Sequence, residues 1–263
     1  WQEGLGGNLE LMVSGSAALQ ERLTRVFAAA GLPIMEGYGL TETSPVISVN
    51  DMRNRGFKIG TVGKIIDNVD IKIAEDGEIL CKGPNVMMGY YKDTGKTAEV
   101  MTDGYFHTGD IGEIDADGFL KITDRKKEMF KTSGGKYVAP ALLENQFKQS
   151  RFIEQIIVIG EGEKMPAALI QVNYEFVKEW ARRHNIEYGS NEAIITNTQL
   201  IKRIQEEIDE VNSNFGKWEQ IKKFEITPDV WSIDAGHLTP TMKMRRKVIK
   251  EKYTQLIENI YRA

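Results

Sequence analysis

The sequence has 263 residues but only one cysteine, Cys81, and three histidines. A single cysteine excludes a disulfide within the chain, and the scattered histidines leave no spacing typical of a zinc site. No apolar run approaches the roughly 20 residues of a membrane-spanning helix. The first residues, WQEGLGGNLE, have neither the basic flank nor the apolar core of a signal peptide. These absences favour a reducing compartment, and we expect the protein in the cytoplasm.

A strong charge of either sign is also absent. The chain has 34 basic and 38 acidic residues, a net charge of -4, which gives no general attraction to nucleic acid or anionic lipid. Basic residues cluster at 125–127 and 243–247, but aromatic residues do not alternate with them as they do in a stacking surface. No nucleic-acid partner is therefore predicted. The hydrophobic share of 41% is that of a globular protein.

The residues that are present predict an α/β start. Residues 9–13 form a short apolar run typical of a strand, and residues 17–31 have apolar positions at helical spacing that end at Gly31. Residues 33–39 predict another strand that leads into a loop. This β-α-β order is typical of an α/β sheet, whose ligands bind at the carboxyl ends of the strands. We therefore expect a ligand near residues 38–42.

The pattern then changes twice. From about residue 56 to 123, short alternating strands surround Asp76-Gly77 and Asp117-Gly118, which predicts hairpins in a small β-rich subdomain. The charged stretch that follows, with two adjacent glycines, predicts a linker or a loop. Beyond it, helices at 140–150, 174–184 and 197–215 and strands within 154–172 and 222–230 predict a compact α+β domain. The apolar stripe of residues 197–215 indicates core packing rather than a membrane anchor.

Three motifs carry chemistry. In GYGLTET (37–43), glycines allow close backbone approach, a threonine hydroxyl can bind phosphate, and Glu42 offers an oxygen suited to Mg²⁺. In HTGD (107–110), Asp110 can accept hydrogen bonds from the hydroxyls of a ribose diol. In LTPTMKMRRKVI (238–249), Lys243 follows a proline turn and can bring positive charge to a phosphate. From the residues alone, ordinary turns and a solvated basic face stay open as alternatives.

The order of the motifs carries a resemblance. The sequence contains, in turn, GYGLTE, GEILCKGPNVMMGYYKD, GYFHTGD, GFLKITDRKKEMFKTSGGKYVAP and LTPTMKMRRKVI. This set resembles the adenylate-forming enzymes, and most of all the AMP-forming long-chain fatty acid CoA ligases. The resemblance implies that ATP activates a fatty acid to acyl-adenylate with Mg²⁺ present, and that coenzyme A then displaces AMP to form a thioester.

The resemblance also implies a nucleotide site. Its expected members are Gly15, Ser16, Ala17, Tyr38, Gly39, Thr41, Asp110 and Arg125. Gly15 to Ala17 would line the adenine pocket and Tyr38 would stack on the ring. Thr41 would contact the α-phosphate, and Glu42 would hold Mg²⁺. Asp110, helped by Arg125, would hold the ribose hydroxyls.

The implied domains follow from the same resemblance. Residues 1–126 would form the end of a large amino-terminal α/β domain, and residues 127–263 a mobile carboxyl-terminal domain with its hinge at Lys127. Gly134 and Gly135 would make room for the pantetheine arm of coenzyme A. Lys243 would act in adenylation. The expected catalytic residues are therefore Lys243, Thr41 and Glu42.

Two features of the family are missing before GYGLTE: the phosphate loop and much of the acyl tunnel. We therefore expect the carboxyl-terminal part of a longer enzyme, inactive without its amino-terminal part. An enzyme for another carboxylic acid and a non-catalytic nucleotide-binding domain stay open. The sequence TMKM replaces the Gly-Lys of many relatives and resembles the long-chain members better. Peripheral contact with a membrane also stays open, because the expected substrate is a lipid.

Overall fold

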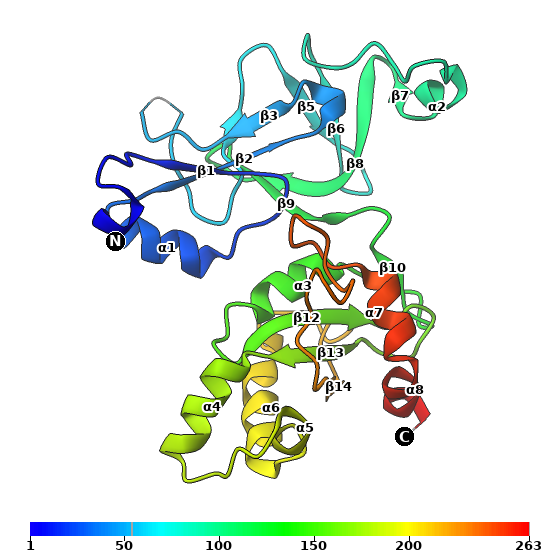
Figure 1. Ribbon diagram of the computed structural model, residues 1–263. Coiled ribbons are helices and arrows are strands. Elements are labelled where there is room, and N and C mark those ends of the chain that lie inside the picture. Colours follow the sequence, from blue (N-terminus) through cyan, green and yellow to red (C-terminus); the bar gives the residue numbers. More distant parts are fainter. Residues whose placement is uncertain (54, 263) are drawn as a thin grey trace. The chain divides into compact units, whose positions relative to one another are not determined.

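The computed structural model describes residues 1–53 and 55–262 and divides into two compact units (Figure 1). Unit 1 is Trp1–Lys127 and unit 2 is Glu128–Ala263. The division falls one residue after the boundary expected from the sequence. Each unit combines helices and strands, which confirms the predicted α/β and α+β classes.

Unit 1 begins with the predicted β-α-β segment. Its first sheet has the order β1-β2-β3-β4. Its elements are η1 (Glu3–Leu5), β1 (Met12–Ser14), α1 (Glu21–Ala29), β2 (Ile34–Gly39), η2 (Thr41–Thr43), β3 (Val46–Val49) and β4 (Lys64–Ile65). The strands β1 and β2 are parallel, with Met12 opposite Ile34, so β1 begins only where β2 offers partners and not at residue 9. The glycines expected in a loop belong to β2, because β3 pairs with them.

The second sheet of unit 1 contains both predicted hairpins. Its order is β5-β6-β8-β7, and β9 pairs with β8. Its elements are β5 (Asp70–Ile73), β6 (Glu78–Lys82), α2 (Thr94–Glu99), β7 (Met101–Thr102), β8 (Tyr105–Ile114) and β9 (Leu120–Arg125). Ile47 from β3 and Ile79, Cys81 and Leu120 from the second sheet form one buried cluster. The two sheets of unit 1 therefore share a core.

The short helix α2 inside the β-rich region was not predicted from the sequence. The side chain of Asp93 accepts a hydrogen bond from the backbone N–H of Lys96 and so caps its first turn. Such a cap replaces one of the partners that the first turn of a helix lacks.

Unit 2 begins where a linker or loop was expected, but this segment forms a small antiparallel hairpin, β10 (Phe130–Lys131) with β11 (Tyr137–Val138). A sheet of order β12-β13-β14 follows. The strands are β12 (Ile153–Ile159), β13 (Ala167–Val172) and β14 (Lys223–Ile226). The helices are α3 (Pro140–Phe147), α4 (Tyr174–Arg183), α5 (Asn191–Ile194), α6 (Thr198–Asn212), α7 (Arg246–Lys252) and α8 (Thr254–Arg262).

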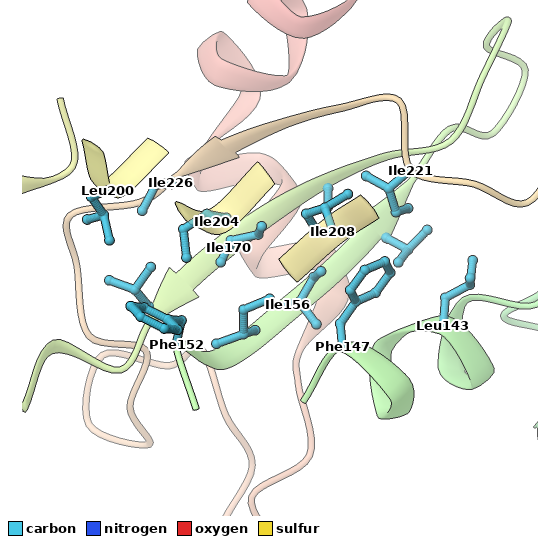
Figure 2. Packing of buried hydrophobic residues seen from close by; sticks show 14 of the residues in the cluster. Leu143, Phe147, Phe152, Ile156, Ile170, Leu200, Ile204, Ile208, Ile221 and Ile226 are labelled. Carbon is cyan, nitrogen blue, oxygen red and sulfur yellow. The ribbon is translucent and has the colours of Figure 1, made fainter. Parts of the chain in front are cut away.

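Apolar side chains cover both faces of this sheet. Figure 2 shows one face, where Ile156 and Ile170 meet Phe147 of α3 and the stripe of α6. On the other face, Ile157 and Leu169 pack with residues of α7 and α8. Successive strand residues point to opposite faces, so the continuous apolar run of β12 reflects burial on both sides. In the predicted stripe of residues 197–215, Leu200, Ile204 and Ile208 are fully buried, and Val211 and Phe215 pack partly buried against the core. Ile201 is 39% exposed, so most of the stripe, but not all of it, has its predicted place in the core.

Within residues 1–53 and 55–262, no helix combines the length and the apolar composition that crossing a bilayer requires.

Candidate functional site

Three residues from separate strands of unit 1 meet at one carboxylate. The hydroxyl of Tyr38 on β2 donates to Oδ2 of Asp110 on β8 at 2.7 Å. Nε of Arg125 on β9 lies 3.2 Å from Oδ1 of the same carboxylate. Asp110 and Arg125 are direct partners across the β8-β9 ladder. The structure therefore brings together three of the residues expected at the adenosine end of the nucleotide.

This carboxylate is buried, and it has an exposed partner. Asp110 is 4% exposed, whereas the side chain of Arg125 is 58% exposed. Burial is the main cause that raises the pKa of Tyr38 far above its usual value, and the negative charge of Asp110 is the second. The phenol of Tyr38 therefore stays protonated and donates its hydrogen bond. A carboxylate has about four lone-pair positions. A carboxylate can therefore accept hydrogen bonds from several groups at once, which is the chemistry that binding of a ribose diol requires.

The turn after β2 explains two residues of the GYGLTET motif. A Cβ added at Gly39 would lie 1.8 Å from the carbonyl oxygen of Pro45, so the turn admits only glycine there. The buried hydroxyl of Thr43 donates to the carbonyl of Pro45 and accepts from the backbone N–H of Leu40 at 3.0 Å. Thr43 thus builds the turn, a role that the sequence did not predict. Thr41 is exposed at the start of η2.

Glu42, the expected Mg²⁺ ligand, is partly buried beside a distant segment. Its Oε1 accepts from the hydroxyl of Tyr90 at 2.9 Å, and its backbone carbonyl accepts from Met87 at 2.8 Å. Among the described residues, no group of three or more His, Cys, Asp and Glu side chains is placed to hold a metal. Mg²⁺ commonly takes one or two carboxylates together with phosphates and waters. The single carboxylate of Glu42 fits that kind of site.

Residues 15–17 follow β1 directly and are exposed. A Cβ added at Gly15 would lie 3.5 Å from the carbonyl oxygen of Gly37 on β2, so this segment runs beside the strand that carries Tyr38. Ser16 has a positive φ of 68°. Ala17 and its neighbours thus lie at the carboxyl edge of the parallel pair, where ligands of α/β sheets bind. The adenine contact itself stays a prediction.

A second charged cluster of unit 1 was not predicted. Glu78 at the start of β6 is 4% exposed, and its carboxylate receives Lys126 at 2.8 Å and the backbone N–H of Gly109 at 2.9 Å. The basic run 125–127 had been interpreted as a solvated face or a weak anion patch. The sequence around Glu78 shows only a carboxylate directly after the Asp76-Gly77 turn, and a glutamate at such a place is usually exposed. Nothing local therefore indicated that it would be buried in a charged cluster.

In unit 2, Lys243 lies on an exposed hairpin turn. The backbone N–H of Thr239 donates to the carbonyl of Lys243 at 2.8 Å, and the N–H of Lys243 donates to the hydroxyl of Thr239 at 3.0 Å. Leu238 and Met244 form the bridge that closes the turn. The side chain of Lys243 therefore projects from a fixed backbone.

The base of this turn is held by an ion pair between a partly buried arginine and a buried glutamate, which the sequence did not indicate. Arg246, the first residue of α7, donates to Glu144 of α3 and to the carbonyl of Val158 on β12, both at 2.7 Å. Glu144 also accepts the backbone N–H of Val158 at 2.7 Å. The pair joins α3, β12 and α7, and α7 begins shortly after Lys243. Its members are 102 residues apart, so no local pattern could indicate it.

The two adjacent glycines lie in the exposed turn between β10 and β11. Gly135 has a φ of +79°, which other residues rarely adopt. At Gly134 an added Cβ would meet nothing closer than the hydroxyl of Thr132 at 3.9 Å. The fold therefore requires glycine at 135 but not at 134. Lys127 is exposed at the end of unit 1, and its role as a hinge stays a prediction.

Two family models match the chain, one in each unit. Residues 2–91 match the AMP-binding enzyme family, and residues 128–263 match the AMP-binding enzyme C-terminal domain. The long-chain-fatty-acid–CoA ligase FadD15 of Mycobacterium tuberculosis is 43% identical over 98% of this chain and 43% of its own length. The human long-chain-fatty-acid–CoA ligase 1 is 37% identical over 99% of the chain and 39% of its own length. The chain thus spans less than half the length of these curated relatives.

Solved structures share the fold. The adenylation domain of a carboxylate reductase from Mycobacterium chelonae superposes with a TM-score of 0.75 at 22% identity, over 100% of this chain and 40% of that one. The anthranilate CoA ligase AuaEII, in complex with anthranoyl-AMP, gives a TM-score of 0.72 at 23% identity, over 94% of this chain and 45% of that one.

Proposed function

We propose, since this chain belongs to the family of AMP-binding enzymes, that it forms the carboxyl-terminal part of a long-chain fatty acid CoA ligase. The convergence of Tyr38 with Asp110 and Arg125 at one buried carboxylate carries the proposal. Asp110 and Arg125 are partners in the β8-β9 hairpin, but Tyr38 comes from another sheet, 72 positions before Asp110, and the hairpin alone does not require it there. The names of the relatives support the fatty acid as substrate.

The proposed reaction has two steps. The carboxylate oxygen of a fatty acid attacks the α-phosphorus of ATP, and the bond to the β-phosphate oxygen breaks to release pyrophosphate. The thiol of coenzyme A then attacks the acyl carbon, loses its proton and expels AMP. Positioning and charge stabilisation account for most of such catalysis.

Unit 1 would hold the nucleotide. Asp110 accepts hydrogen bonds from the ribose diol, Tyr38 offers its ring to the adenine, and Arg125 orients the carboxylate. The exposed hydroxyl of Thr41 donates to the α-phosphate. Glu42 would hold Mg²⁺, which supplies charge neutralisation for the phosphates when it is bound. The partly buried setting of Glu42 and its bond from Tyr90 support this role, because they fix one carboxylate oxygen.

Unit 2 would act in both steps through different segments. Lys243 brings its positive charge to the reacting carboxylate and α-phosphate during adenylation. Gly134 and Gly135 leave space for the pantetheine arm during thioester formation. We propose Lys127 as the hinge between these two uses. The exposed positions of Lys243 and of the glycine turn support the proposal, because a segment that reaches a ligand must not be buried in its own unit.

The first test is pyrophosphate release. The longer ligase should release pyrophosphate when ATP, Mg²⁺ and a long-chain fatty acid are present, and Lys243→Ala should abolish the release. The 263-residue chain alone should release none above the Lys243→Ala control, because the family's phosphate loop is not among its residues. Lysine-dependent release by the chain alone would contradict the proposal that the phosphates are held elsewhere.

The same assay separates the alternatives. Release with aryl or amino acids but not with fatty acids would replace the substrate and keep the enzyme class. Binding of ATP without release for any acid would favour a non-catalytic nucleotide-binding domain. The predictions of a cytoplasmic location and of peripheral membrane contact stay predictions.

A further inference from the structure

Glu78 is a buried carboxylate of unit 1 that the proposed nucleotide site does not use. It lies at the first position of β6 and is 4% exposed. Its Oε1 accepts the backbone N–H of Gly109 at 2.9 Å. Its Oε2 lies 2.8 Å from Nζ of Lys126 and 3.0 Å from Nδ1 of His107. Donors from β8 and from the segment after β9 thus converge on one side chain.

The charge of Glu78 is compensated by these neighbours. Burial by itself raises the pKa of this carboxyl, but the bonds from Lys126, His107 and Gly109 outweigh burial, so the pKa lies below its usual value. The carboxylate is therefore ionised at neutral pH. Removal of one partner of a buried charge leaves the other uncompensated and is strongly unfavourable. The cluster should hence behave as one unit.

The geometry fixes Lys126 at two levels. Its backbone N–H donates to the carbonyl of Gly109 at 2.8 Å, and its ammonium lies 2.7 Å from Asp76 in addition to Glu78. The preceding residue, Arg125, is tied to Asp110. The next residue, Lys127, is exposed and ends unit 1. The chain is thus fastened to β8 up to residue 126. The side chains of the Glu78 cluster hold no described residue after 126.

We infer that Glu78 is a positioning residue that clamps Lys126 to β8 and makes Lys127 the first residue free to act as the hinge. The inference rests on the proposed two-step function. Gly109 directly precedes Asp110 on β8, so the carboxylate of Glu78 fixes the part of the strand that presents the expected ribose ligand. Glu78 therefore joins the nucleotide site to the start of the hinge. Loss of the clamp would move the pivot into β9. Unit 2 would then be misplaced for thioester formation, the step for which it has to move.

The test compares the two half-reactions in the longer ligase. Glu78→Gln keeps an acceptor for Gly109 but loses the charge, and Lys126→Met loses the cation. Each should slow thioester formation from supplied acyl-adenylate by about tenfold more than it slows pyrophosphate release, since small misplacements of a positioned group are costly in rate. Lys126→Arg should restore much of the loss. The double variant should be no worse than Lys126→Met, because both changes break one interaction.

Lys58→Met is the matched control. Lys58 also pairs with two carboxylates of unit 1, Asp115 at 2.7 Å and Asp117 at 3.0 Å, and its side chain is 43% exposed against 47% for Lys126. The control should leave the ratio of the half-reactions unchanged. If Glu78→Gln and Lys126→Met instead slow both half-reactions equally, or change neither, the positioning role is wrong.

A second readout does not depend on activity. Hydrogen exchange at the backbone amide of residue 126 should be faster in Glu78→Gln and Lys126→Met than in Lys58→Met. The reason is that the hydrogen bond from this amide to the carbonyl of Gly109 opens more often without the clamp. Equal exchange in all three would overturn the clamp. If the unchanged protein releases no pyrophosphate with any acid, the proposed function fails, and the exchange rates alone then decide whether Glu78 holds residue 126.

Discussion

The proposed nucleotide cluster of unit 1 (Tyr38, Asp110 and Arg125) and the Lys243 turn of unit 2 present charge in opposite ways. Asp110 is 4% exposed and is held by two side chains from other strands. Lys243 is exposed, and the bonds that fix its turn are made by the backbone and by Thr239. A group that keeps a ligand in place gains from rigid burial. A cation that acts in only one of two steps has to remain on the surface. Its position is then fixed by the hydrogen bonds of the turn that carries it.

The difference predicts that function and stability are separable at Lys243. Lys243→Ala should lower acyl-adenylate formation by about a thousandfold, the scale of a lost transition-state charge contact. It should leave the unfolding temperature and thioester formation from supplied acyl-adenylate unchanged, because its side chain is exposed and lies outside the second step. Calorimetry and separate assays of the two steps test this. Equal loss in both steps would contradict the assigned role.

Arg246, at the base of the same turn, should show the reverse. Arg246→Met leaves Glu144 buried without its cation and should destabilise unit 2 by about 3 kcal/mol. Urea unfolding measures the change. The matched control is Arg262→Met, whose pair with Glu258 is exposed and should contribute at most about 1 kcal/mol. Similar losses in both variants would mean that the buried pair does not stabilise the turn's base.

The two adjacent glycines allow a comparison within one turn. Gly134→Ala has space in the fold and should keep the unfolding temperature, yet slow thioester formation by about tenfold, because an added methyl group narrows the proposed path of the pantetheine arm. Gly135→Ala is strained at its positive φ and should cost about 1 kcal/mol of stability as well. Unchanged kinetics in Gly134→Ala would remove this glycine from the coenzyme A site.

Tyr38 tests the burial side of the comparison. Tyr38→Phe keeps the ring and removes the bond to Asp110, which should destabilise unit 1 by about 1 to 2 kcal/mol, since a buried acceptor loses a donor. Nucleotide binding should weaken less than stability does, because the ring still stacks. Calorimetry and ATP titration measure the two effects. Weaker binding with unchanged stability would mean that the hydroxyl serves the ligand and not the fold.

Local patterns predicted the elements of this fold better than its contacts. The β1-α1-β2 segment and the two hairpins follow from apolar spacing and from Asp-Gly turns, which act over a few residues. The hairpin β10-β11 was missed because its strands have two residues each and lie in a charged stretch. A helix was expected after Lys243, but its division into α7 and α8 was not, and Ile260 of α8 is buried in the core.

The site shows the same limit. Motif order indicated Tyr38, Asp110 and Arg125, but the bond between Tyr38 and Asp110 joins residues 72 positions apart and depends on strand register. Glu78 and Lys126 are 48 positions apart, and each alone is typical of an exposed residue. Such pairs arise from tertiary packing, so a single sequence carries no local signal for them.

His237 gives the smallest of these effects, and it lies in unit 2 next to the Lys243 turn. Its ring is 1% exposed and stacks on Tyr253, Nε2 lies 3.2 Å from Nζ of Lys252, and Nδ1 has no partner among the residues that the structure describes. Burial and then the charge of Lys252 lower the pKa of His237, while Asp229 opposes them. The folded unit therefore holds a neutral ring where the unfolded chain takes up a proton.

Because the unfolded state binds this proton near pH 6.5 and the folded state only at lower pH, unit 2 should lose stability as the pH falls below about 6.5. His237→Leu should remove this contribution, so the unfolding temperature of the variant should fall less steeply between pH 7.5 and pH 5.5. Lys252→Met removes the second cause and should reduce the slope in part. Identical slopes in all three proteins would mean that His237 takes up its proton equally in both states.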